Sequence, residues 1–141
     1  QEENTALHLL PKALTLGVGC RKGTSQAALE NAYAALLAEQ NFAPEAFVQA
    51  ASIDLKANEP GLLAFCTAHS WELKTYAAEE LSKLPGDFTP SPFVAQITGV
   101  DNVCERAAVR ASGGHLIRKK WKGAGVTFAV ALAPVHFDWR W

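Results

Sequence analysis

The chain has 141 residues, 49% of them hydrophobic, which is enough for one domain with a single core that folds without disulfides or a structural metal. Its formal net charge of −1 argues against a nucleic-acid phosphate backbone as the partner. A local basic patch remains a candidate, at Arg118, Lys119, Lys120 and Lys122. No apolar run is long enough to cross a bilayer, so no membrane partner is expected.

The cysteines and histidines are scattered along the chain. Three cysteines without CxxC spacing favour a reduced, cytoplasmic protein: Cys20, Cys66 and Cys104. The four histidines show no metal-ligand spacing, so no metal site is expected. Residues 1–12 are expected to form a leader or inter-domain linker before one domain over 13–141. The chain contains no methionine, so it is either a piece of a longer protein or numbered without its start.

Strands and helices alternate over the first two-thirds of the chain. Strands are expected at 13–19, 48–53 and 73–76, and helices at 25–40, from 59 onward and at 77–84. Helical pieces at 93–97 and 103–111 follow, and a hairpin of 116–119 and 126–132 joined by 121–125 closes the domain. This order predicts an α/β fold: a three-layer α/β/α single domain, its sheet mostly parallel, with a C-terminal β-hairpin.

The segment from Gly17 to Thr24 is the strongest local signal. It leads from the first strand to the first long helix through a glycine-rich loop, where backbone N–H groups and a positive helix end favour an anion. Arg21 and Lys22 add two positive charges. The spacing G-x-G-x-x-x-G is one residue longer than the dinucleotide fingerprint, and no Gly-Lys-Ser/Thr closes a P-loop. The alternative is a tight turn that needs glycine for a positive φ.

Three charged residues follow the second predicted strand. Asp54, Lys56 and Glu59 lie where a parallel sheet places its ligands, at the carboxyl ends of the strands. They could orient a substrate or act as acid and base. The alternative is helix capping with a surface ion pair, which stabilises little.

Two thiols lie near predicted helix starts. Asp101 or Asn102 can cap the helix that begins beside Cys104, and a thiol there has a lowered pKa and more thiolate character. Cys20 lies at the glycine loop. Both are therefore candidates for reactive thiols, and the alternative is a free buried cysteine.

Four motifs occur in the order typical of one family: Leu16 to Thr24, Ala51 to Lys56, Glu59 to Leu62 and Val100 to Glu105. The later residues Gly113-Gly114, Lys119-Lys120 and the 125–131 strand continue the pattern. In these motifs the chain resembles the family of CobE and the C-terminal domain of CbiG, from cobalamin (vitamin B12) biosynthesis. The resemblance covers roughly residues 12–133.

This resemblance implies a role in cobalt-precorrin-5A hydrolysis, in which a δ-lactone on the macrocycle opens and acetaldehyde is released, or the less clear role of stand-alone CobE. The ligand is then a carboxylate-rich corrin precursor, which needs cations and N–H donors at its rim. Asp54 and Glu59 are the candidate catalytic residues. The candidate substrate-binding residues are Gly19, Cys20, Arg21, Lys22, Gly23, Thr24, Lys56, Cys104 and Glu105.

Two other functions stay open: a non-catalytic carrier or chaperone of a corrin intermediate, and a nucleotide-binding module. No cofactor is expected apart from cobalt carried within a corrin substrate. The expected protein partners are other cobalamin-pathway enzymes or the rest of the chain's own parent protein. The aromatic tail with Trp139 and Trp141 would also suit a homodimer contact.

Overall fold

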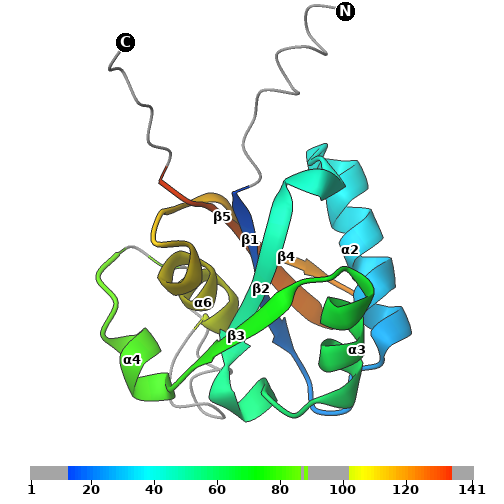
Figure 1. Ribbon diagram of the computed structural model, residues 1–141, viewed down its shortest axis with the longest axis horizontal. Helices are drawn as coiled ribbons and strands as arrows, with labels where there is room; N and C mark the ends of the chain where they lie inside the picture. The colour runs from blue at the N-terminus through cyan, green and yellow to red at the C-terminus, as the bar shows by residue number, and fades with distance from the viewer. Residues whose placement is uncertain (1–12, 87, 89–101, 135–141) are drawn as a thin grey trace, which may run out of the picture.

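A computed structural model of the protein describes residues 13–86, 88 and 102–134 (Figure 1). Three sequence predictions lie outside these residues: the leader at 1–12, the helical piece at 93–97 and the aromatic tail at 137–141. Among the described residues, no helix has both the length and the apolar character that crossing a membrane requires.

A five-stranded mixed sheet forms the centre of the domain, in the order β3-β2-β1-β5-β4. The strands β1, β2 and β3 run parallel, whereas β5 runs antiparallel to β1 and pairs with β4 as a hairpin. The predicted α/β fold with a C-terminal hairpin is confirmed. The strands are β1 Leu14–Cys20, β2 Phe47–Ile53, β3 Glu72–Tyr76, β4 His115–Gly123 and β5 Val126–Leu132.

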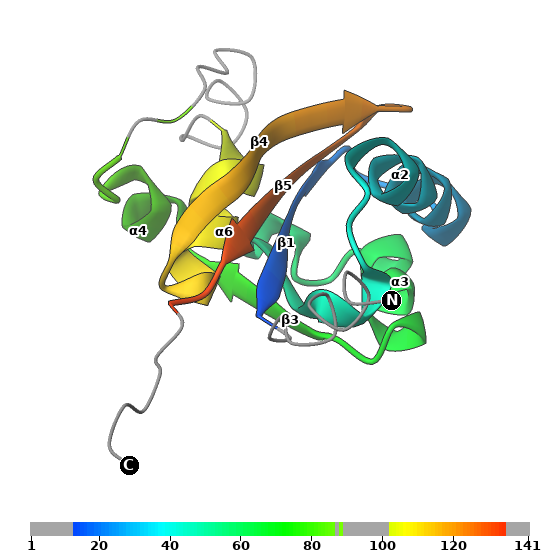
Figure 2. The same cartoon turned by 90° about the horizontal axis from the view of Figure 1, so that it is seen from above.

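Helices cover both faces of this sheet (Figure 2). One face carries α2 (Gln26–Gln40) and α3 (Pro60–Ala68), and the other carries α4 (Ala78–Ser82) and α6 (Val103–Ser112). Two short 3₁₀ helices, η1 (Pro44–Ala46) and η2 (Asp54–Lys56), flank β2. The result is the predicted three-layer arrangement.

Local sequence signals explain where the long helices begin and end. The hydroxyl of Ser25 accepts a hydrogen bond from the N–H of Ala28 and so caps α2, which ends at Asn41 in the left-handed region. Pro60 occupies the first turn of α3, where its missing N–H is no loss. Asn102 caps α6 through the N–H of Glu105. Its own φ of 51° is positive, a conformation that asparagine tolerates better than most residues.

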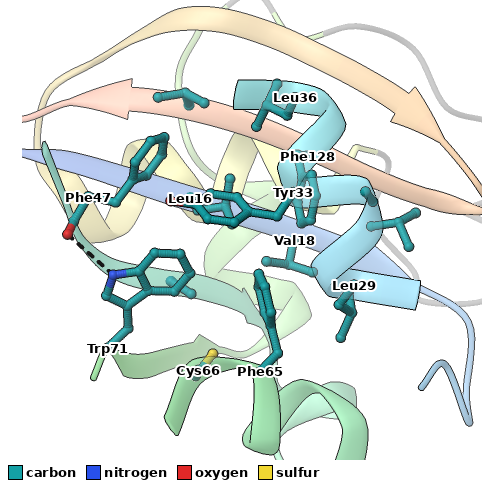
Figure 3. Close-up of a cluster of buried hydrophobic side chains, with 14 of the residues drawn as sticks. Leu16, Val18, Leu29, Tyr33, Leu36, Phe47, Phe65, Cys66, Trp71 and Phe128 are labelled. Carbon is teal, nitrogen blue, oxygen red and sulfur yellow. Dashed lines mark hydrogen bonds between the residues drawn. The ribbon is translucent and has the colours of Figure 1, made fainter. Parts of the chain in front are cut away.

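The core on the α2 and α3 face is aromatic (Figure 3). Tyr33 of α2 meets Phe65 of α3 edge-to-face at a centroid distance of 5.7 Å, and Phe65 stacks near Phe128 of β5 at 6.3 Å. The indole N–H of Trp71 donates to the carbonyl of Phe47 at 3.2 Å, so the ring is buried without losing its hydrogen bond.

The hairpin is longer than the sequence predicted. Trp121 and Gly123 belong to β4, and only Ala124 and Gly125 form the turn, with φ values of 55° and 79°. Positive φ at both central residues suits the tight two-residue turns of β-hairpins. The prediction placed Trp121 in the connection because glycines follow it closely, but its ring is buried and stacks on Phe128 at 6.0 Å.

Candidate anion-binding edge of the sheet

The carboxyl ends of β1 and β2 meet at one edge of the sheet, together with the first turn of α3. Cys20 ends β1, Asp54 directly follows β2, and Glu59 precedes α3. Glu59 reaches the turn that follows β1, because it accepts the N–H of Gly23 at 2.8 Å, and the charges of Lys56 and Glu59 both affect the pKa of the Cys20 thiol. The structure therefore brings together residues that the sequence placed at two separate strand ends.

A four-residue turn, Arg21 to Thr24, connects β1 to the capping residue of α2. The N–H and the hydroxyl of Thr24 both donate to the carbonyl of Arg21, at 3.1 and 2.7 Å. Gly23 has a φ of 81°, which favours glycine. Its N–H donates to a carboxylate oxygen of Glu59 at 2.8 Å. The sequence predicted that the N–H of Gly23 could bind an external anion, but in the structure this N–H binds the Glu59 carboxylate instead.

Gly17 lies inside β1 and has a packing role. A Cβ at this position would overlap the carbonyl oxygen of Cys104 in α6, so glycine allows the helix to approach the strand closely. Gly19, also in β1, packs against the hydroxyl of Thr127 in the neighbouring strand. Only Gly23 of the three motif glycines has a positive φ, so the predicted glycine loop is in fact strand followed by a short turn.

The expected low pKa of the thiols is wrong for both candidates. Burial raises the pKa of Cys104 from 9.0 to about 12, although the thiol lies in the first turn of α6. Burial also raises the pKa of Cys20, against the opposing effects of Lys56 and of a hydrogen bond with Thr24. Cys104 is completely enclosed, and the cost of desolvating its thiolate exceeds the stabilisation that the positive end of α6 gives to a negative charge. Neither group has enhanced thiolate character.

Glu105 is a buried carboxylate that ties α6 to the hairpin. It is fully buried, and one of its oxygens accepts the N–H of Lys120 in β4 at 2.6 Å. Together with its neighbour Cys104 it lies inside the protein in this arrangement, so neither predicted substrate-binding residue is at the surface. Both are placed to hold the N-terminus of α6.

The remaining predicted residues are accessible at the edge. Arg21 and Lys22 are exposed, Lys56 is half-buried, and Asp54 is exposed at the start of η2. The first turns of α2 and α3 follow β1 and β2 here, and the first turn of α6 packs on Gly17. Helix N-termini and cations together favour a negatively charged ligand.

Sequence reasoning missed Thr127. Its hydroxyl donates to the carbonyl of Gly19 at 3.3 Å and so links β5 to β1, close to the Cys104 thiol, whose pKa it lowers. The signal was weak because a threonine within an apolar strand is ordinary. Within residues 13–86, 88 and 102–134, no three His, Cys, Asp or Glu side chains gather as a metal site would require.

The family model described as cobalamin synthesis G C-terminus matches residues 14–131, which include β1 to β4 and all of β5 except its last residue. The chain belongs to this family. The chain is 37% identical over 133 residues to a cobalt-precorrin-5A hydrolase of Priestia megaterium. This alignment covers 94% of the chain and 35% of the relative. It is 33% identical over 125 residues to the cobalt-precorrin-5A hydrolase of Salmonella typhimurium, covering 89% of the chain and 36% of the relative.

The crystal structure of CobE, a protein from the cobalamin biosynthetic pathway, matches with a TM-score of 0.77 and 28% identity. The match covers 88% of this chain and 92% of CobE. The resemblance inferred from the four motifs is therefore confirmed. This CbiG C-terminal domain is a cobalamin-biosynthesis domain that spans about a third of the length of the two hydrolases.

Proposed function

We propose that this domain binds a carboxylate-rich corrin precursor at the carboxyl edge of its sheet and acts as the C-terminal part of a cobalt-precorrin-5A hydrolase. One observation carries the proposal: in a member of this family, Arg21, Lys22 and Lys56 gather with the first turns of the helices at one edge. A ring with acidic side chains needs such cations at its rim.

Lactone opening sets chemical requirements that this edge can meet. Water must add to the lactone carbonyl while a base takes its proton and a donor stabilises the oxyanion. We assign the base to Asp54, which is exposed and directly follows β2. Glu59 instead accepts the N–H of Gly23 and so positions the turn that carries Arg21 and Lys22. The proposed oxyanion donors are the N–H groups of Arg21 and Lys22, because those of Gly23 and Thr24 already donate to Glu59 and to the carbonyl of Arg21.

Binding is tested by titrating the chain with dicyanocobyrinic acid, a cobalt corrin polycarboxylate, and following the visible spectrum. We expect the double variant Arg21→Glu, Lys22→Glu to bind about tenfold or more weakly, because each charged contact contributes about 1.5–3 kcal/mol. ATP and NAD serve as competitors. Nucleotide binding without corrin binding would replace this proposal with the nucleotide-binding function.

Turnover is tested by acetaldehyde release from cobalt-precorrin-5A. We expect weak or no release by this chain alone, and full release by the complete parent hydrolase. Asp54→Asn in that hydrolase should abolish release while leaving binding intact. Glu59→Gln should weaken binding as well, because it loosens the turn. Unaltered release in the Asp54→Asn variant would remove Asp54 as the base.

A carrier function is the second candidate. The match to CobE favours this function, because it covers 92% of the CobE chain. In CobE, this domain therefore makes up nearly the whole chain and is not part of a larger hydrolase. A carrier would bind the corrin tightly, release no acetaldehyde in any context, and pass its ligand to the next enzyme.

A further inference from the structure

The hairpin strand β4 carries four cations that the proposed site does not use. They fall within five positions, at Arg118, Lys119, Lys120 and Lys122, in a chain whose net charge is −1. Lysines on an edge strand often serve to prevent pairing with other sheets. Preventing such pairing requires charge somewhere along the strand, but it does not require a lysine at any particular position. The position of each lysine can therefore indicate a further role in binding.

Strand register places Lys122 at the same edge as the Arg21–Thr24 turn. Lys122 pairs with Thr127 of β5, and Thr127 pairs with Gly19 of β1, so the three residues form one row across the sheet. With neighbouring strands about 4.8 Å apart, Lys122 lies roughly 10 Å from Gly19 along this row. Figure 2 shows β4, β5 and β1 lying side by side with the end of β4 at the margin of the sheet.

Lys120 lies close to the first turn of α6. Its N–H donates to Glu105 at 2.6 Å, and the charge of its ammonium acts on the neighbouring Cys104 thiol. Paired residues project to the same face of a sheet, so Lys122 projects with Thr127 to the α6 side. The N-terminus of α6 therefore lies between the cations of β4 and the turn from Arg21 to Thr24 that follows β1.

Acidic and basic side chains share this edge. Its carboxylates are Asp54, Glu59 and the buried Glu105, and they keep their negative charge although Glu59 accepts the N–H of Gly23 and Glu105 that of Lys120. Among the cations, Lys56 lies beyond β2, whereas Lys122 is exposed near the end of β4. Cations therefore occur on both sides of the end of β1.

We propose that Lys122 forms a second rim of the binding site, which holds carboxylates of the same ligand whose other carboxylates bind Arg21 and Lys22. The inference rests on the proposed function and specifies its ligand class: a polycarboxylate wide enough to span β1 to β4. Ligands with one acidic group gain nothing from the second rim. The hairpin is thus a specificity element as well as the end of the sheet.

The experiment measures affinity for dicyanocobyrinic acid in the wild type, in Lys122→Glu and in Lys83→Glu. Lys83 is a matched control, because it is also exposed, its replacement changes the net charge identically, and it follows α4 beside β3, the outer strand on the other side of the sheet from β4. We expect about tenfold weaker binding for Lys122→Glu and no change for Lys83→Glu. Dicyanocobinamide, whose side chains are amides, should distinguish none of the three proteins.

Three outcomes separate this inference from the function on which it rests. If the wild type binds cobyrinic acid and both variants match it, the second rim is overturned while corrin binding stands. If both variants weaken equally, net charge explains the effect, and the second rim is again overturned. If the wild type does not bind, the proposed function fails, and this inference fails with it. Circular dichroism checks folding, and Lys122→Gln, with a smaller expected loss, replaces any variant that misfolds.

Discussion

The two faces of the sheet are built in different ways. The face under α2 and α3 is filled by large rings, with Tyr33, Phe65 and Phe128 in mutual contact. The face under α6 is lined by small residues, and there Gly17 allows the helix backbone to touch the strand. The first face supplies buried apolar area, and the second fixes the position of a helix N-terminus at the candidate site.

Buried polar groups occur on both faces. Asn102 and Glu105 are enclosed at the start of α6, whereas Ser52 alternates with Ala51 and Ile53 along β2 and therefore faces α2 and α3. Each has a partner: Asn102 accepts from the N–H of Glu105, Glu105 accepts from Lys120, and the Ser52 hydroxyl donates to the carbonyl of Val18 at 2.8 Å. Satisfied polar groups favour one geometry over its alternatives, whereas apolar rings tolerate small shifts.

Phe65→Ala should have the largest effect on stability. The ring is fully buried among Tyr33, Trp71 and Phe128, so its loss leaves a cavity and should lower the free energy of unfolding by about 4 kcal/mol. Urea unfolding measures this. Leu63→Ala, on an exposed position of the same helix, is the control and should cost less than about 1 kcal/mol. Equal losses would contradict the role assigned to the aromatic face.

Gly17→Ala should come next, at about 3 kcal/mol, because the new methyl group overlaps backbone atoms of Cys104 that cannot rotate away. Gly23→Ala is the matched control. It meets no atom within 4 Å and has only its positive φ to oppose it, a cost of about 1 kcal/mol. Corrin binding by Gly17→Ala should also weaken, since α6 must shift. A variant as stable as Gly23→Ala would show that α6 does not depend on this close approach.

The smallest effect is a pH dependence from Cys104. The folded protein keeps this thiol protonated up to a pKa of about 12, whereas the unfolded chain releases the proton near pH 9.0. Stability should therefore fall as the pH rises above 9, by roughly 1 kcal/mol at pH 10. Unfolding of the wild type and of Cys104→Ala is compared at pH 8 and 10. The contribution is absent if both proteins lose the same stability over this interval.

Much of the fold was predictable because its signals are local. The alternation of apolar strands with helical periodicity gave the order of elements, and Ser25, Pro60 and Asn102 marked helix starts at the observed places. The hairpin turn was misplaced because the composition after Lys120 suggests a loop. Burial of Trp121 against Phe128 decides that region, and this contact joins residues on different strands.

The candidate site was predictable only in part. Four family motifs identified the glycine segment and the residues after β2, and comparison with known proteins confirmed the family. The assignment of Cys104 as a reactive thiol depended on its place near a predicted helix start, and that of Glu105 depended on the family motif. Enclosure by the surrounding layers, which local sequence does not show, reverses the expected pKa of the thiol and places the carboxylate inside.

By itself, the sequence determined the element order, the family and the presence of cations beside a glycine turn, because each depends on neighbouring residues. Only the tertiary structure decided what the glycines do. Gly17 admits a helix and Gly23 turns the chain, because a glycine's role depends on which backbone approaches it. The strand register likewise decided that Lys122, more than 100 positions after Gly19, lies in the same row of the sheet.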